Sequence, residues 1–310
     1  MGSILQTKQW ADFKKSFGFE IISSDNLFVH KKQLPFGKNF LYVPEVSSSQ
    51  ISGNQVEQLK SMAKQHNSIF LRLELIDRYG DNANKILLSM GFKKSFEQVQ
   101  PKWRQIVDLT PTRGTILSQM KQKGRYNVKL AQRKGVQIKR VSLKEFGEKE
   151  KIVLDQFFEI YNQTVKREGI GGRSREYFVE MAKSFEQTEY LWVYIAYFEN
   201  KPLSAALISM YDGVASYLYG GSSSQNREVM APYLMHWQII VDAKEEGAKL
   251  YDLIGRSAPD NPGSKWAGIT RFKEQFGGQA VEILGSYDFI NSKFAYQVFK
   301  LIEKRRRSEA

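Results

Sequence analysis

Apolar positions in the first hundred residues follow two spacings, which predicts a region that alternates strands with helices. In four short segments, aromatic and β-branched residues alternate with polar ones or form a short run, as in half-buried or buried strands. The expected strands cover 26–32, 38–44, 68–75 and 103–109.

Helical spacing appears twice between these strands. A helix is expected over 54–66, and a shorter one over 83–92 that Gly91 ends, because glycine tolerates the left-handed conformation that follows many helices. The apolar face of the longer helix holds Val56, Leu59 and Met62.

Beyond residue 110, helical and strand patterns are longer and clearer. A basic helix is expected over 115–134, with Thr115 as its cap and Gly135 as its stop. Two turn signals, Glu199-Asn200-Lys201 and Asp212-Gly213, separate three strands. The remaining helices are expected over 148–167, 174–185 (capped by Ser174), 231–247 and 268–278, and the strands over 136–141, 191–198, 204–211, 214–221, 249–255 and 279–289.

This order of elements is the layout of a GNAT acyltransferase lobe, and the first region resembles a degraded version of it. The expected fold class is α/β with mixed sheets, as two GNAT-like lobes around a cleft. The first lobe covers 1–110, completed by a basic C-terminal helix over 287–310, and the second covers 111–286. A chain of 310 residues suits two lobes of ordinary domain size.

Composition limits the chemistry that the chain can use. No cysteine is present, which excludes disulfides, thiolate metal sites and a cysteine nucleophile. The histidines His30, His66 and His236 lie far apart in sequence without metal-ligand spacing, so no metal site is expected. No run approaches the about 20 apolar residues that span a bilayer, and no signal peptide is evident. We therefore expect a cytoplasmic protein.

Positive charge is concentrated in one segment of a chain whose net charge is +13. Residues 109–144 contain ten bases and no acid, and the tail adds Lys304, Arg305, Arg306 and Arg307. Such clusters attract nucleic acid, phosphates or anionic lipid, although a solvated helix face has the same composition. Peripheral contact with the inner face of a membrane through these bases is a further interpretation.

Three blocks carry a resemblance to a known family. KQKGRYNVKLAQRKGVQI resembles the basic helix of the Fem family, APYLMHWQIIVDAKEEGAKLYDLIG its A-P-Y helix and Y-D-L-G strand, and GITRFKEQFGG its F-K-x-x-F-G segment. The blocks keep the family's order over residues 100–290. No heptad run is long enough for the coiled-coil arm of the staphylococcal members, so the chain resembles the armless type.

The resemblance implies a non-ribosomal peptidyltransferase. Family members move an amino acid from aminoacyl-tRNA onto an amine of the stem peptide of a peptidoglycan precursor, UDP-MurNAc-pentapeptide or its lipid-linked form, in building interpeptide bridges. It implies no cofactor, with aminoacyl-tRNA as co-substrate.

The stretch that would hold CoA in a GNAT enzyme supports this interpretation. The loop needs the form Q/R-x-x-G-x-G/A, so that backbone N–H groups reach the pyrophosphate. Here Met230 fills the first glycine position, and Pro232, which has no N–H, fills the second.

The resemblance also implies site residues. Lys273 matches the family's functional lysine and is expected to polarise the ester carbonyl and stabilise the oxyanion, unless it is an exposed helix lysine. Glu74 matches a position that usually holds Asp, and is expected to bind or deprotonate the acceptor amine, unless it is a rim carboxylate.

Arg173 matches the arginine that grips the precursor's phosphates, and Lys14 is favoured over Lys15 as a second phosphate ligand. Tyr177 and Tyr219 match tyrosines of the substrate cleft, with core packing as the alternative. Phe272 is also expected in the substrate site. The candidate tRNA-binding residues are Lys121, Lys123, Arg125, Lys129, Arg133 and Lys134.

Two other functions remain open from sequence. One keeps the fold and uses acyl-CoA to acylate an amine of a sugar or lipid. The other is a non-catalytic RNA-binding module on a GNAT-like scaffold, which would bind uncharged RNA with steep salt dependence.

Overall fold

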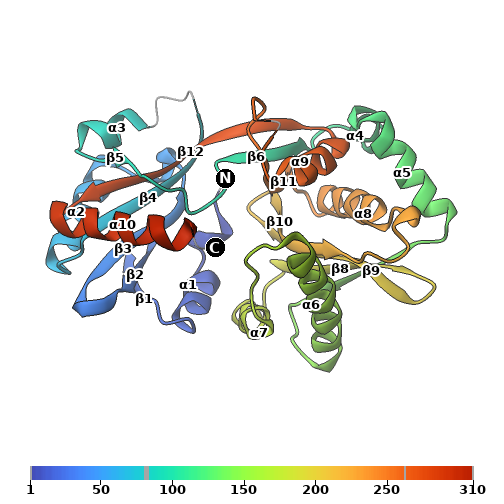
Figure 1. Ribbon diagram of the computed structural model, residues 1–310, viewed down its shortest axis with the longest axis horizontal. Helices are drawn as coiled ribbons and strands as arrows, with labels where there is room; N and C mark the ends of the chain where they lie inside the picture. Colours follow the sequence, from blue (N-terminus) through green and yellow to red (C-terminus); the bar gives the residue numbers. More distant parts are fainter. Residues whose placement is uncertain (1, 80–83, 262, 309–310) are drawn as a thin grey trace. The chain divides into compact units, whose positions relative to one another are not determined.

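The protein folds into mixed β-sheets covered by helices, and the computed structural model describes residues 2–79, 84–261 and 263–308 (Figure 1). The predicted α/β class with mixed sheets is confirmed. Among the helices of these ranges, none combines the length and the apolar character that crossing a bilayer requires.

The chain divides into two compact units. The large unit comprises Trp103–Val281, and the small unit comprises Gly2–Lys102 together with Glu282–Ala310. The division therefore falls after residues 102 and 281, whereas the sequence placed it after 110 and 286. Strand 103–109 accordingly belongs with the large unit.

The small unit is built on a sheet in which one parallel pair interrupts antiparallel neighbours. β1 pairs with β2 and β2 with β3, both antiparallel; β3 is parallel to β4, and β4 is antiparallel to β12, which also pairs with the short β5. The strands are β1 (Glu20–Ser24), β2 (Leu27–Gln33), β3 (Asn39–Val46), β4 (Phe70–Arg78), β5 (Lys93–Lys94) and β12 (Gln279–Ile290).

Helices cover both faces of this sheet, because residues of a strand point alternately to either side. On β4, Leu71 and Leu73 share a core with Val56 and Leu59 of α2, whereas Phe70 packs with α10 on the other face. Of the predicted face of α2, Met62 is only partly buried. The small unit's helices are α1 (Lys8–Lys15), α2 (Gly53–Gln65), α3 (Asn84–Ser89) and α10 (Lys293–Ser308).

A buried charge network fixes α10 to its sheet. Arg72 donates through Nε and Nη2 to the two carboxylate oxygens of Asp288, at 2.7 and 2.8 Å, and through Nη1 to Glu97. The Tyr296 hydroxyl of α10 donates to Asp288 Oδ2 at 2.6 Å. Arg72 and Asp288 are almost fully buried, so each charge depends on its partner.

The large unit has one parallel pair among antiparallel neighbours. Its strands lie in the order β6, β11, β10, β9, β8 and β7, and only β10 and β11 run parallel. The strands are β6 (Trp103–Asp108), β7 (Gln137–Ser142), β8 (Leu191–Phe198), β9 (Lys201–Tyr211), β10 (Val214–Ser222) and β11 (Leu250–Gly255).

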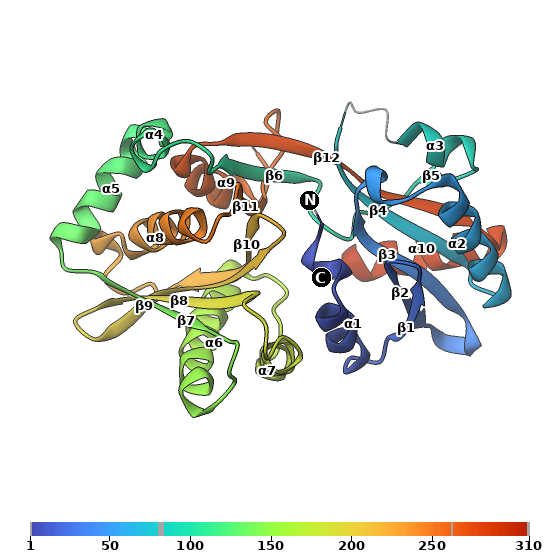
Figure 2. The same cartoon turned by 180° about the vertical axis from the view of Figure 1, so that it is seen from behind.

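Helices α8 and α6 lie on opposite faces of β8 and β9, as Figures 1 and 2 both show. Helix α8 is buried on several sides, and its apolar residues join a core with Val128 and Ala131 of α5. The large unit's helices are α4 (Arg113–Gln119), α5 (Gln122–Arg133), α6 (Glu148–Glu168), α7 (Arg175–Ser184), α8 (Ala231–Glu245) and α9 (Ala267–Lys273).

The predicted single helix over 115–134 is wrong, because the chain forms two helices there. Thr112, not Thr115, caps α4: its hydroxyl accepts from the Thr115 N–H at 3.2 Å. The break falls at Met120 and Lys121, both in extended conformation. Met120 is buried, and the Lys121 N–H donates to the Gln275 carbonyl at 3.1 Å, a contact that a continuous helix would not allow.

Other local predictions are confirmed. The Ser174 hydroxyl caps α7, and Gly135 and Gly91 adopt the left-handed conformation after their helices. Glu199 and Asn200 also have positive φ, as a tight hairpin turn requires. Residue 83, the predicted start of the helix over 83–92, lies outside the described residues.

We predict that Gly278→Ala destabilises the fold far more than Gly247→Ala. Both glycines have positive φ, +74° and +83°, so alanine is strained at either position, by roughly 1–2 kcal/mol. At Gly278 the new Cβ would also lie 2.1 Å from the Ile106 carbonyl oxygen, whereas at Gly247 it meets open space. Urea denaturation should show a loss of about 3 kcal/mol or more for Gly278→Ala. Equal losses would contradict this packing.

Candidate active site

The two parallel strands of the large unit pair only at their beginnings. Val214–Ser216 of β10 pair with Leu250–Asp252 of β11. Beyond it, β10 has a bulge between Tyr217 and Tyr219, and Ile254 of β11 takes a φ of +54°. The strands therefore separate, and side chains from α8 and α9 gather at the opening.

Lys273, the last residue of α9, is buried there with only 6% of its surface exposed. Its Nζ donates to the carbonyl oxygen of Gly255, the last residue of β11, at 2.6 Å. The hydroxyl of Thr270 accepts from the Ser257 N–H at 2.8 Å and so fastens α9 beside the strand end. The alternative that Lys273 is an exposed helix lysine is wrong.

Burial lowers the pKa of Lys273 to about 8, against the opposing effect of the Asp252 carboxylate. Asp252 is engaged on both sides: it pairs with Arg104 at 2.9 Å and accepts from the Ile254 N–H at 2.6 Å. At neutral pH the lysine thus remains mostly protonated, with a charge that bulk water does not screen.

An aromatic cluster borders this ammonium. The Tyr217 ring centroid lies 5.9 Å from Lys273 Nζ, and His236 packs against both Tyr217 and Phe272. Burial, and then the charge of Lys273, lowers the pKa of His236 to about 3, so the imidazole is neutral. Its Nδ1 lies 2.7 Å from the Tyr251 hydroxyl. Phe272 itself is part of this aromatic packing and only partly buried.

A second cluster combines Arg173 with three tyrosines. Arg173 is an exposed residue whose guanidinium lies 5.0 Å from the ring centroid of the buried Tyr177, and the Tyr177 hydroxyl is 3.0 Å from that of Tyr219. The Arg173 N–H donates to the Tyr161 hydroxyl at 3.0 Å. Burial, and then Tyr219, raises the pKa of Tyr177, so its hydroxyl stays protonated. The structure therefore brings together the three residues that the sequence predicted there.

Comparison with known proteins identifies the family of the chain. The profile described as the FemAB family matches residues 88–201 and 194–304. The chain belongs to the FemAB family. Since the matches cover more than half of the chain, the resemblance predicted from the three sequence blocks is confirmed.

Relatives of this FemAB member are named as glycyltransferases. The lipid II:glycine glycyltransferase of Staphylococcus haemolyticus is 22% identical over 393 positions, covering 98% of this chain and 92% of the relative. The Staphylococcus aureus protein of the same name is also 22% identical, with the same coverage. The alignments run longer than this chain, so the relatives carry insertions that it lacks. The prediction that the chain is an aminoacyltransferase is confirmed.

Solved structures agree on the fold. FemX superposes with a TM-score of 0.83 at 19% identity, covering 96% of this chain and 94% of FemX. L-PGS from Bacillus licheniformis superposes with a TM-score of 0.62 at 14% identity, covering 98% of this chain and 92% of the other.

In this FemAB member, the candidate tRNA-binding residues differ in their exposure and in their hydrogen-bond and ion-pair partners. Lys123, Lys129 and Arg133 are exposed on α5 and Lys134 is exposed just after it, and none of the four has an ion pair within the described residues. Lys121 pairs with Glu274 at 2.9 Å. Arg125 is half-buried and donates to the carbonyls of Ser118 (at 3.0 Å) and Met120, the end of α4.

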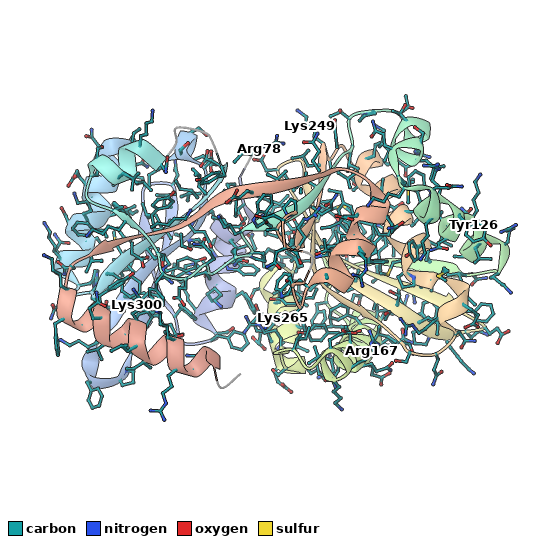
Figure 3. The ribbon with its side chains drawn as sticks, turned by 45° about the horizontal axis from the view of Figure 1, so that its top comes forward. Arg78, Tyr126, Arg167, Lys249, Lys265 and Lys300 are labelled. Carbon is teal, nitrogen blue, oxygen red and sulfur yellow. The ribbon has the colours of Figure 1, made fainter. Side chains whose placement is uncertain are left out.

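The exposed face of α5 also carries an aromatic residue that the sequence analysis missed. Tyr126 is 56% exposed and projects from the helix, as Figure 3 shows. Residues 126, 129, 130 and 133 follow helical spacing, a signal that was readable from the sequence. The buried side of α5 is formed by Gly124, Asn127, Val128 and Ala131.

The small unit of the FemAB fold holds the other predicted residues. Glu74 is fully buried, so the alternative of a rim carboxylate is wrong. It accepts from the Tyr42 hydroxyl, the Gln100 N–H at 2.9 Å and the Ser286 hydroxyl at 3.3 Å. Lys14 Nζ lies 4.6 Å from the ring centroid of Phe19, whereas Lys15 is exposed and pairs with Asp12.

We predict that Lys273 makes the free energy of unfolding depend on pH. The folded protein releases the Lys273 proton near pH 8 and the unfolded chain near 10.5, so within that window the unfolded chain binds more protons. Stability contributed by this site therefore rises with pH, by up to about 3 kcal/mol.

Urea denaturation across the window should show the wild type gaining stability relative to Lys273→Met, since methionine carries no proton. Replacement of the exposed Lys249 by Met serves as the control for loss of a lysine. A constant difference between wild type and Lys273→Met would refute the buried-ammonium assignment.

Proposed function

We propose that this enzyme transfers an amino acid from aminoacyl-tRNA to an amine of the stem peptide of a peptidoglycan precursor, and so builds interpeptide bridges. The single observation that carries the proposal is the buried ammonium of Lys273, held by the Gly255 carbonyl where β10 and β11 separate. The lipid II:glycine glycyltransferases among the relatives support the class of acceptor.

The reaction needs a positive charge where negative charge develops. The neutral acceptor amine attacks the ester carbonyl carbon, and the carbonyl oxygen becomes an oxyanion in the tetrahedral intermediate. The new amide bond forms as the ester bond to the ribose breaks, and a proton passes from the amine to the departing ribose oxygen. Lys273 stabilises the oxyanion, and the dry surroundings strengthen its effect.

Arg173 is the proposed ligand of the precursor's phosphates. Its guanidinium is exposed on one side and supported on the other by Tyr177, which suits a forked contact with phosphate oxygens. Tyr219 holds the Tyr177 hydroxyl in place. Lys14 remains the proposed second phosphate ligand, and Phe272 the proposed aromatic contact near Lys273.

Glu74 is the proposed partner of the acceptor amine. Because it already accepts from three donors and has no exposed surface, an amine must replace one of them. The hydroxyl of Ser286 is the donor that can be displaced most simply, since its hydrogen bond to Glu74, at 3.3 Å, is the longest of the three.

Aminoacyl-tRNA, rather than acyl-CoA, is the proposed donor, with no further cofactor. The loop before α8 supports this choice: Met230 has a φ of +57° and its side chain packs against the core, and Pro232 occupies the first turn of the helix. The loop therefore lacks the glycines that a pyrophosphate cradle requires.

The exposed face of α5 is the proposed tRNA surface. Its bases can neutralise phosphates without reading bases, and Tyr126 offers a face on which an unpaired base can stack.

We predict transfer from tRNA charged with all twenty amino acids to UDP-MurNAc-pentapeptide or to its lipid-linked form, tested in separate reactions. Mass spectrometry should find a single increment that identifies the amino acid and the acceptor. Lys273→Met should reduce turnover about a hundredfold or more, and Lys249→Met should not. Wild-type turnover should fall as pH rises through about 8, where Lys273 loses its charge.

Retained turnover in Lys273→Met would remove this residue from the mechanism. An absence of any increment, together with measurable binding of acyl-CoA, would favour an acyl-CoA-dependent N-acyltransferase instead.

We predict that the double variant Lys129→Gln/Arg133→Gln binds tRNA more weakly, with a salt dependence reduced by roughly two phosphate contacts. Tyr126→Ala should weaken binding without changing that salt dependence. Fluorescence anisotropy with uncharged tRNA at several salt concentrations measures both effects. Lys304→Gln/Arg305→Gln on α10 removes the same charge elsewhere, and an equal loss in this control would contradict a site on α5.

A further inference from the structure

Helix α10 presents apolar residues on two opposite sides. One side is covered: Tyr296 and Phe299 pack against Phe70 and the partly buried Phe40 and Phe96. The other side forms an uncovered stripe with the spacing i, i+4, i+7 and i+8 of a single helix face. The stripe consists of Phe294, Val298, Leu301 and Ile302, which are 83%, 41%, 68% and 58% exposed.

Positive charge flanks the stripe. Helix α10 carries several bases and a single acid, Glu303, which pairs with Arg306 at 3.2 Å. Lys300 lies toward the sheet, with its Nζ 5.9 Å from the Phe96 ring, and its position is labelled in Figure 3. The other described bases of the helix, all exposed, are Lys293, Lys304 and Arg305.

The stripe cannot turn inward, because the opposite side of α10 is fixed. The Tyr296 hydroxyl donates to Asp288, which the buried Arg72 holds with two hydrogen bonds. A rotation of the helix would break this network and expose Phe299. The apolar side chains therefore stay exposed in the folded unit, at a cost that ordinary surface helices avoid.

A second exposed aromatic residue belongs to the same unit. Phe36 lies in the turn Pro35–Gly37 between β2 and β3, is 99% exposed and has a φ of +59°. The neighbouring Leu34 packs against the same cluster that anchors α10.

We propose that α10 is an interfacial helix that binds the surface of an anionic lipid bilayer. Its apolar stripe enters the boundary between headgroups and acyl chains, and its bases contact lipid phosphates. Charge complementarity favours this partner over a second copy of the chain, whose α10 would carry the same positive charge. It also favours lipid over RNA, because a phosphate backbone offers nothing apolar to the stripe. Contact through bases alone was predicted from sequence; the stripe adds the apolar component.

Vesicle co-sedimentation of the full chain tests the proposal without any substrate, so its outcome is independent of the proposed reaction. We expect binding to vesicles of mixed phosphatidylglycerol and phosphatidylcholine, and much weaker binding to phosphatidylcholine alone. Phe294→Ser/Leu301→Ser should lower the partition coefficient by about tenfold or more, because two exposed apolar side chains are lost. Lys304→Gln/Arg305→Gln should lower it on anionic vesicles and reduce its salt dependence.

Matched controls distinguish vesicle binding through α10 from nonspecific hydrophobic adsorption and from nonspecific electrostatic attraction. Ile86→Ser/Leu88→Ser removes two exposed apolar side chains from α3 of the same unit, 56% and 48% exposed, and should leave vesicle binding unchanged. Lys129→Gln/Arg133→Gln on α5 removes the same charge and should also leave it unchanged. Thermal denaturation confirms that each variant is folded.

Three outcomes would overturn the proposal. The first is no binding of the wild type to anionic vesicles, and the second is equal losses in the α10 and control variants. The third is a dimer in sedimentation velocity that Phe294→Ser/Leu301→Ser dissociates while vesicle binding persists, which would assign the stripe to a second copy.

Discussion

The large unit depends on the early separation of its two parallel strands. β10 and β11 pair over three residues. Beyond them, the backbone N–H and C=O groups of each strand need other hydrogen-bond partners. β11 does so by pairing again with β6 at Gly255, and by offering the Gly255 carbonyl to Lys273. The pairing of β10 with β11 ends before Gly255, and the carbonyl there gives a buried charged side chain, Lys273, its hydrogen-bond partner.

The structure places a stability cost at the candidate active site. Lys273 has one recorded hydrogen bond and a carboxylate, Asp252, that already serves Arg104. A better partner would lower its energy and weaken its ability to interact with an oxyanion. Arg256 illustrates the opposite arrangement, because Glu274 at 2.8 Å and Gln105 neutralise and hold it. Lys273 has fewer hydrogen-bond partners than Arg256, so of the two it is the better candidate to stabilise an oxyanion.

Much of the fold was predictable because local signals were strong. Hairpin turns at Glu199-Asn200 and Asp212-Gly213, the cap at Ser174 and the long apolar runs of the second half act within a few residues. The break at Met120 was not predictable, because it depends on the backbone of Gln275, far along the chain. Helix α1 and strand β1 gave no clear pattern, and the sequence did not predict them.

For the candidate site, the family resemblance led to Lys273 and to the Arg173–Tyr177–Tyr219 cluster, which the structure assembles. They did not reveal Tyr217, His236 or Asp252, whose importance comes only from packing around the lysine. Glu74 shows the same limit, since sequence could not distinguish a fully buried carboxylate from one at a rim.

The close approach of α5 to the segment after α9 has an evolutionary consequence. At Gly124 even a methyl group would lie 2.4 Å from the Gln275 carbonyl oxygen, so the inner side of α5 cannot change without moving the segment that follows Lys273. The outer side, with Lys123, Tyr126 and Lys129, is exposed. Substitutions on the outward face of α5 should therefore cost little stability, so the surface proposed for tRNA can diverge among related chains while the packing around Lys273 stays constant.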